Sequence, residues 1–244
     1  MTATVGIDMS LTSPGIACFW AGVWSLWCFA TRKREENLRW QSADGTITLC
    51  VLPMIPGPAL ADAERYRHII THIQRECVPH WPTDSRLLLE HYIFAKPSMS
   101  GSSYKLHELC GILKYHLTQT HPGLTTVAPS VWKKQLSGLS GLSKYQTLCL
   151  VQSKLPQLDL MKLFGFEATL VVPNPVQDLA DAIGIVMASM TEDIHTFKTG
   201  KITNRIKKAK KDKIKKAKGD VVKKAKMNKK TCHTVTPLAT IVRP

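Results

Sequence analysis

The stretch that decides the fold is Thr4–Met9, TVGIDM, near the start of the sequence. Its apolar residues predict a short buried strand, yet Asp8 stands between Ile7 and Met9. Burying a lone carboxylate costs several kcal/mol unless it is paired or bound to a metal. We therefore expect this strand to place a functional acid at one end of a sheet.

The same conflict recurs twice further along the chain. Arg86–Phe94, RLLLEHYIF, predicts a second buried strand that carries Glu90. Asp178 and Asp181 follow at the start of a helix predicted over Gln177–Met190, where the i, i+3 spacing puts both on one face. Negative charge is favoured at a helix N-terminus. The sequence thus offers four candidate catalytic and metal-binding acids: Asp8, Glu90, Asp178 and Asp181.

Such a set of acids suits phosphodiester hydrolysis. Carboxylates are the preferred ligands of Mg²⁺ and also bind Mn²⁺. Two such ions, held about 3.5–4 Å apart, activate a water and stabilise the leaving oxygen. Three of the four acids also have a simpler interpretation. Asp178 suits a helix N-cap with Asp181 at its third position, and Glu90 suits a salt bridge to Arg86. The order strand-Asp, strand-Glu, helix-Asp-Asp favours the metal site.

The pattern of elements predicts an α/β fold. An antiparallel meander of strands comes first, and alternating strands and helices follow, which predicts a mixed sheet with helices on both faces. The remaining strands are expected at Gly15–Trp20, Val23–Ala30 and Thr125–Ala128, with a weaker one at Thr46–Leu52. The remaining helices are expected at Ala59–Cys77, Ser102–Leu117, Ser130–Leu136 and Ser143–Leu155.

Positive charge gathers near the end of the chain. The formal net charge is +15, and residues 201–230 hold 15 Lys/Arg against two acids. Their Ile/Val-Lys-Lys-Ala-Lys repeat has a spacing of eight residues, so its apolar positions drift by about 80° per repeat around a helix and form no stripe. We predict a globular domain over 1–198 and a disordered lysine-rich tail over 199–244. The tail suits either a DNA clamp that releases counterions from phosphates or a nuclear localisation signal.

Other features narrow the class of protein. No run reaches the roughly 20 apolar residues that a membrane span needs, so no membrane partner is expected. The seven cysteines are scattered singly, which argues against a disulfide framework or a zinc site. We predict an intracellular protein that is not secreted and that resides in the cytoplasm or the nucleus.

Four stretches together resemble the motifs of one nuclease family. They are VGIDMSLTSPGIA from residue 5, EHYIFAKPSMSGSSYKLHELCGIL from residue 90, APSVWKKQLSGLSGLSKYQ from residue 128, and DLADAIGIVMA from residue 178. In this order and with these internal spacings they resemble the RuvC family of Holliday junction resolvases over roughly residues 4–190. The chain resembles a viral or otherwise divergent branch of that family.

The resemblance implies an RNase H-like fold and a homodimer that nicks two strands of a four-way DNA junction symmetrically. It implies two Mg²⁺ ions in each site, with Mn²⁺ as a substitute, held by the four acids named above. It also implies residues that contact DNA. These are Lys96, Lys105, Lys133, Lys144 and Phe94. Lys133 and Lys144 also suit solvated helix surfaces, and Phe94 equally suits a core.

The chain also departs from the family pattern. The stretch Arg32–Pro58 is longer than a minimal member needs, Pro97 replaces an expected polar residue, and the lysine-rich tail is additional. These departures leave two further hypotheses open. One is an RNase H-like nuclease acting on flaps, forks or other branched DNA, and the other is a non-catalytic basic nucleic-acid-binding protein.

Overall fold

The computed structural model describes residues 2–30, 38–55, 61–91, 101–167 and 170–191. Phe94, Lys96 and the predicted tail over 199–244 lie outside these residues, and so does the predicted domain boundary at 198. What the sequence predicts for them therefore stays a prediction. No helix in the described ranges is both long and apolar enough to cross a membrane.

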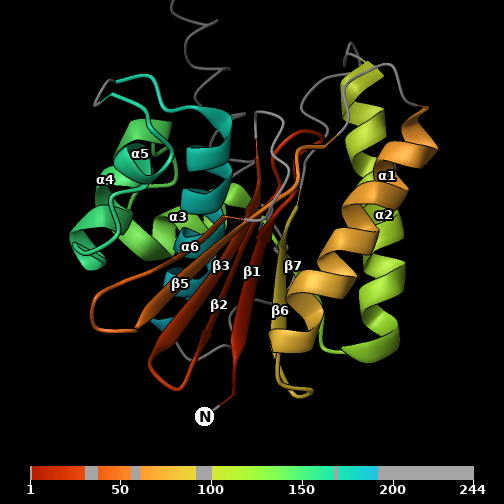
Figure 1. Cartoon of the computed structure of the whole chain (residues 1–244), viewed down its shortest axis with the longest axis horizontal. Helices are drawn as coiled ribbons and strands as arrows, with labels where there is room; N and C mark the ends of the chain where they lie inside the picture. Colours follow the sequence, from red (N-terminus) through yellow and green to blue (C-terminus); the bar gives the residue numbers. More distant parts are fainter. Residues whose placement is uncertain (1, 31–37, 56–60, 92–100, 168–169, 192–244) are drawn as a thin grey trace, which may run out of the picture. The chain divides into compact units, whose positions relative to one another are not determined.

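One mixed sheet of seven strands organises the described part of the chain (Figure 1). Its order is β4-β5-β3-β2-β1-β6-β7. The strands are β1 Thr4–Asp8, β2 Gly15–Trp20, β3 Val23–Phe29, β4 Leu38–Gln41, β5 Ile47–Leu52, β6 Arg86–Glu90 and β7 Thr125–Val127. Strands β1, β2 and β3 form an antiparallel meander, whereas β6 and β7 continue the sheet parallel to β1.

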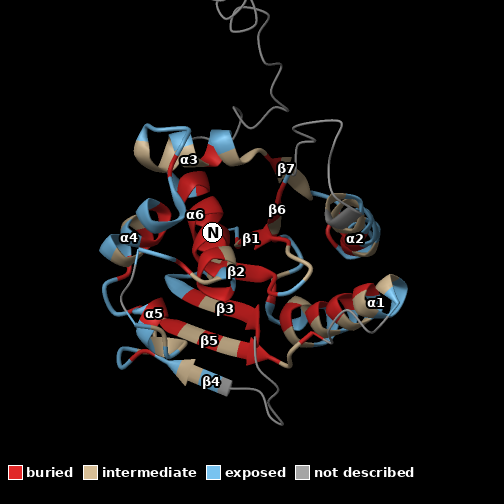
Figure 2. Ribbon diagram, turned by 90° about the horizontal axis from the view of Figure 1, so that it is seen from above, coloured by how far each residue is buried: buried red, intermediate tan, exposed pale blue. Residues whose placement is uncertain are grey.

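Helices cover both faces of the sheet (Figure 2). On one face lie α1 (Asp62–His72), which continues into a π-helical turn at Ile73–Cys77 and a short 3-10 turn at Val78–His80, and α2 (Gly101–Thr120). On the other face lie α3 (Pro129–Ser137), α4 (Lys144–Lys154), α5 (Leu160–Leu163) and α6 (Asn174–Met190). Each face therefore closes its own hydrophobic core against the sheet.

Helix α6 is the central helix of its face, and almost all of its residues are buried. It lies directly on β1 and β2, and glycine makes this close approach possible. At Gly6 in β1, an added Cβ would come within 2.8 Å of Val186 Cγ2 in α6. Because α6 is held so close to the centre of the sheet, the acids that it carries are placed beside the strand ends.

The predicted fold class is confirmed in its architecture: the described residues form an α/β fold with an antiparallel meander, a mixed sheet and helices on both faces. The weakly predicted strand at Thr46–Leu52 is present as β5. Among the described residues, one strand and one α-helix were not predicted. Strand β4 pairs antiparallel with β5 inside the long stretch Arg32–Pro58, and α5 is a single turn too short to show helical spacing.

Candidate active site

Two of the predicted acids meet at one end of the sheet. Asp8 is the last residue of β1, and Glu90 is the last residue of β6. The two strands are parallel neighbours, with Ile7 opposite Leu89, so the acids that follow these partners leave the sheet side by side. Both side chains are buried, Asp8 being 3% and Glu90 6% exposed.

Helix α6 brings Asp178 and Asp181 to the same place. Gly15 is the register partner of Asp8, and a Cβ added at Gly15 would overlap the backbone carbonyl of Asp178. The helix backbone therefore rests on bare strand backbone at the level of Asp8. The structure thus brings all four predicted acids together, although they come from sequence positions as far apart as 8 and 181.

Specific donors hold these carboxylates, and the two simpler interpretations are wrong. Helix α6 begins at Asn174, so Asp178 lies beyond the N-cap; it accepts a hydrogen bond from Ser13 Oγ at 2.6 Å. Glu90 Oε1 accepts a hydrogen bond from Trp132 Nε1 at 3.0 Å. Arg86 is four residues away along the same strand, about 13 Å, which is too far for a salt bridge to Glu90.

Burial and mutual repulsion change the acidity of the cluster. Burial raises the pKa of Asp8 well above its usual range, and the Glu90 carboxylate raises it further by its charge and by a hydrogen bond. Asp178 and Asp181 add to the effect. Two carboxyl groups that share a hydrogen bond need a proton between them. The metal-free cluster therefore cannot hold four full negative charges.

The two acids of α6 show the same effect. Burial is the main cause that raises the pKa of Asp178 and of Asp181 to about 6. Hydrogen bonds oppose it, from Ser13 to Asp178 and from Gln177 Nε2 to Asp181 Oδ2 at 2.9 Å. The positive charge of Lys144 also opposes it at both acids. Acids that titrate this far above their usual range are typical of functional sites.

The predicted DNA-contacting lysines fall into different places. Lys133 Nζ lies 4.0 Å from Asp181 Oδ1, and its side chain is 14% exposed, so it borders the cluster and is not a solvated surface lysine. Lys144 lies close enough to lower the pKa of both α6 acids. Lys105 lies on α2, where its Nζ pairs with Asp62 Oδ2 of α1 at 2.9 Å. Its contact with DNA stays a prediction.

Three residues that hold the acids were missed in the sequence: Ser13, Trp132 and Gln177. Ser13 belongs to a turn, and Trp132 has the pattern of an ordinary core residue in a short helix. Gln177 stands four residues before Asp181, a spacing at which helical side chains meet. That spacing was the one available signal, since the other two contacts depend on distant segments.

The cluster has the chemistry of a site for a hard divalent cation. All four acids supply oxygen ligands, and Asp181 Oδ1 is buried and accepts no hydrogen bond within the described residues. Across those same residues, no three His, Cys, Asp or Glu side chains stand ready to hold one ion together. Trp132, Ser13 and Gln177 engage one oxygen each of three acids, and the second oxygen of each of these carboxylates is not engaged by these three donors.

Fold and site together define a class: an α/β protein with a mixed sheet and a largely buried acidic cluster at the carboxyl ends of β1 and β6. No protein-family model matches the sequence, and no curated protein matches it either. Solved structures do match at the level of the fold. RuvC from Thermus thermophilus has a TM-score of 0.46 and 16% identity, over 78% of this chain and 94% of that one.

Two further solved structures have similar scores. T. thermophilus RuvC in complex with a Holliday junction substrate has a TM-score of 0.48 and 16% identity, with 78% of this chain and 94% of that chain covered. The yeast mitochondrial Holliday junction resolvase Ydc2 has a TM-score of 0.44 and 16% identity, with 78% of each chain covered. At this level of identity the likeness concerns the fold.

Proposed function

We propose that this protein is a metal-dependent endonuclease that cuts branched DNA, with the four-way junction as its preferred substrate. The observation that carries the proposal is the meeting of four acids in one cluster, in which Asp8, Glu90 and Asp181 are buried and Asp178 is partly buried. Such a cluster is costly to stability when no cation balances it. A requirement for cations explains why the fold keeps it.

The chain's own residues have distinct roles in this proposal. The four acids would hold two Mg²⁺ ions, or Mn²⁺ in their place. When bound, these ions supply an activated water and stabilise the leaving oxygen of the phosphodiester. Lys133 and Lys144 border the cluster, where their positive charge attracts the DNA phosphate and steadies charge that develops on it. Without a cation, the acidic cluster repels the DNA backbone.

The substrate and the assembly rest on the sequence resemblance. Four motifs that resemble those of RuvC support a homodimer that presents two clusters to the two strands of a junction. The lysine-rich tail would add affinity that does not depend on DNA sequence. A cytoplasmic or nuclear location and a viral or divergent origin are proposed on the same basis.

One experiment tests the proposal directly. The full chain is incubated with an immobile four-way junction and with linear duplex of the same sequence, in Mg²⁺, in Mn²⁺ and in EDTA. We expect paired, symmetric nicks on the junction, in the presence of either cation, with the duplex intact. Faster cutting of flaps or forks would move the substrate to other branched DNA. Binding without cutting in every divalent cation would overturn the proposal and favour the non-catalytic DNA-binding hypothesis.

A further inference from the structure

Among the described residues whose side chains donate to the acidic cluster, Trp132 is the most completely buried. Its side chain is 0% exposed, and its indole N–H donates to Glu90 Oε1 at 3.0 Å. Tryptophan has a donor and no acceptor, so this contact can serve only a carboxylate oxygen that keeps its lone pair available. A core role alone does not require that the indole nitrogen face an acid.

The space for the indole is built by a glycine of another helix. At Gly184 in α6, an added Cβ would come within 2.7 Å of Trp132 Cζ3. Around the ring lie buried residues of β6, β7 and α6, namely Leu88, Val127, Ile185 and Ala188. The indole is therefore fixed from several sides, and its N–H direction is fixed with it. A preorganised donor of this kind holds its partner without further loss of entropy.

The residue after Trp132 extends the arrangement to a second acid. Lys133 Nζ lies 5.0 Å from the centroid of the Trp132 ring and 4.0 Å from Asp181 Oδ1. A cation over an indole face is attracted to it. Adjacent residues of α3 thus contact the acid of β6 and an acid of α6.

We propose that Trp132 is a positioning residue. It holds one oxygen of Glu90, so that the other oxygen is left for the cation, and it aligns Lys133 beside Asp181. This inference rests on the proposed function, because it assigns to Trp132 the placement of a metal ligand. Outer contacts of this kind change metal affinity or activity by about 10–100-fold when they are removed.

The test compares two buried tryptophans. Trp132→Phe keeps an aromatic ring and removes the N–H that Glu90 accepts. Trp81→Phe is the matched control: Trp81 is 6% exposed, lies in the other core, and its indole nitrogen has no hydrogen-bond partner within the described residues. We expect Trp132→Phe to cut a four-way junction about 10–100-fold more slowly and to need more Mg²⁺, with junction affinity within about twofold. Trp81→Phe should match the wild type.

A second measurement does not depend on activity. The chain has six tryptophans, so its ¹H–¹⁵N spectrum holds six indole signals, and the Trp132 and Trp81 signals are assigned by their loss in the two variants. In DNA-free wild-type protein, we expect Mg²⁺ to shift the Trp132 signal saturably and to leave the Trp81 signal in place.

The possible outcomes separate this inference from the proposed function. If the wild type cuts junctions, but Trp132→Phe behaves like Trp81→Phe and the Trp132 signal ignores Mg²⁺, the positioning role is wrong and the nuclease stands. If the wild type cuts no DNA, but Mg²⁺ shifts the Trp132 signal alone, the positioning of a metal ligand stands and the nuclease is wrong.

Discussion

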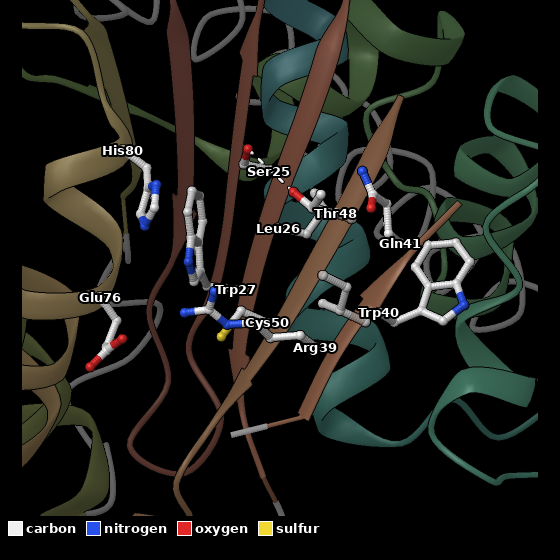
Figure 3. Close-up of a pocket in the computed structure, with 11 residues that line it drawn as sticks. Ser25, Leu26, Trp27, Arg39, Trp40, Gln41, Thr48, Cys50, Glu76 and His80 are labelled. Carbon is white, nitrogen blue, oxygen red and sulfur yellow. Dashed lines mark hydrogen bonds between the residues drawn. The ribbon is translucent and has the colours of Figure 1, made fainter. Parts of the chain in front are cut away.

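The central end of the sheet and its β4–β5 edge differ in an instructive way. The edge carries the more obvious hollow, a cavity of about 530 Å³ on one face of β3, β5 and β4 (Figure 3). Trp27, Arg39 and Cys50 line it from the strands, and Glu76 and His80 from the turns after α1. At the central end, the cavity that includes Asp178 measures only about 250 Å³.

The acidic side chains rank the two regions the other way: the central end, which has the smaller cavity, holds the acids with perturbed pKa values. At the edge, the lining acid Glu76 has a partner next to it, since Arg75 Nε lies 2.7 Å from Glu76 Oε1. At the centre, burial and neighbouring carboxylates raise the pKa of Asp8, Asp178 and Asp181. Perturbed acids in a cluster indicate function, whereas an open hollow between strands need not. The site is therefore found by its electrostatics and not by its volume.

The largest expected effect follows from removing one charge of the central cluster. Asp8→Asn keeps the size of the side chain but removes the charge of a proposed metal ligand, and it should slow junction cleavage by about 10³-fold or more. Binding of the uncut junction, measured by fluorescence anisotropy in Ca²⁺, should stay within about threefold.

The edge supplies the matched control for this variant. Glu76→Gln removes one charge from the lining of the larger cavity and should leave the cleavage rate unchanged. If Asp8→Asn cuts at the wild-type rate, the central cluster is not the active site. If Glu76→Gln loses activity to the same degree, the contrast between the two regions is lost.

The second largest effect should come from moving the central helix without touching an acid. Gly15→Ala places a Cβ where the backbone of Asp178 lies, so α6 has to shift away from β2. A misplacement of about 1 Å costs roughly 10²-fold in rate, and the overpacking costs about 1–3 kcal/mol of folding stability. Junction cleavage and urea unfolding measure the two effects.

Gly111→Ala is the control for this glycine. It lies in α2, where an added Cβ meets no atom within 4 Å, so it should be neutral or stabilise the protein by roughly 0.5–1 kcal/mol. Wild-type cleavage by Gly15→Ala would mean that the close contact of α6 with β2 does not set the position of Asp178.

The acids of the central cluster could be predicted from the sequence because the signal for each one lies within a few neighbouring residues. An acid inside a run of apolar residues is visible in Thr4–Met9 and again around Glu90 without any knowledge of the fold. The i, i+3 pair on α6 is equally local. To predict that the four acids meet, it was enough to combine these local signals with two further points. Parallel neighbouring strands end at the same edge of a sheet, and the motifs resemble those of a known family.

The rest depends on contacts that no local pattern contains. Strand β4 is four residues long and exists because β5 offers it an edge. Gly15 looks like part of a turn, and its contact with α6 appears only when residue 178 is folded onto β2. Trp132 has the pattern of a core residue, and its side chain is indeed buried. Its hydrogen bond to Glu90, however, joins residues that are 42 positions apart in the sequence.

A smaller effect should appear in stability, because burial disfavours the charged form of the acids in the central cluster. The folded state raises the pKa of Asp181 from 3.8 to about 6, so it binds a proton more tightly than the unfolded chain does. Stability from this group is therefore fully present below about pH 4 and is lost as the pH rises towards 6. In EDTA at about pH 7.5, Asp181→Asn should be more stable than the wild type by about 2 kcal/mol.

Urea unfolding at several pH values measures this difference. The gain should vanish near pH 4, where the wild-type acid is already neutral. The exposed Asp84 precedes β6, at the end of that strand opposite to Glu90, and gives the control Asp84→Asn, whose stability should follow the wild type at every pH. A variant at position 181 that is less stable than the wild type at neutral pH would mean that this carboxylate is kept for folding.

The smallest expected effect tests the edge itself. Arg39 is exposed on β4 and lines the edge cavities on both sides of that strand. If the edge takes no part in cleavage, Arg39→Ala should change the cleavage rate and junction affinity by less than about twofold, and stability by less than about 0.5 kcal/mol. A tenfold loss of junction affinity, with a weaker dependence on salt, would instead make β4 part of the DNA-binding surface. That result would also give the unpredicted strand in Arg32–Pro58 a purpose, because an added strand that carries a phosphate contact widens the surface on which a branched substrate can lie.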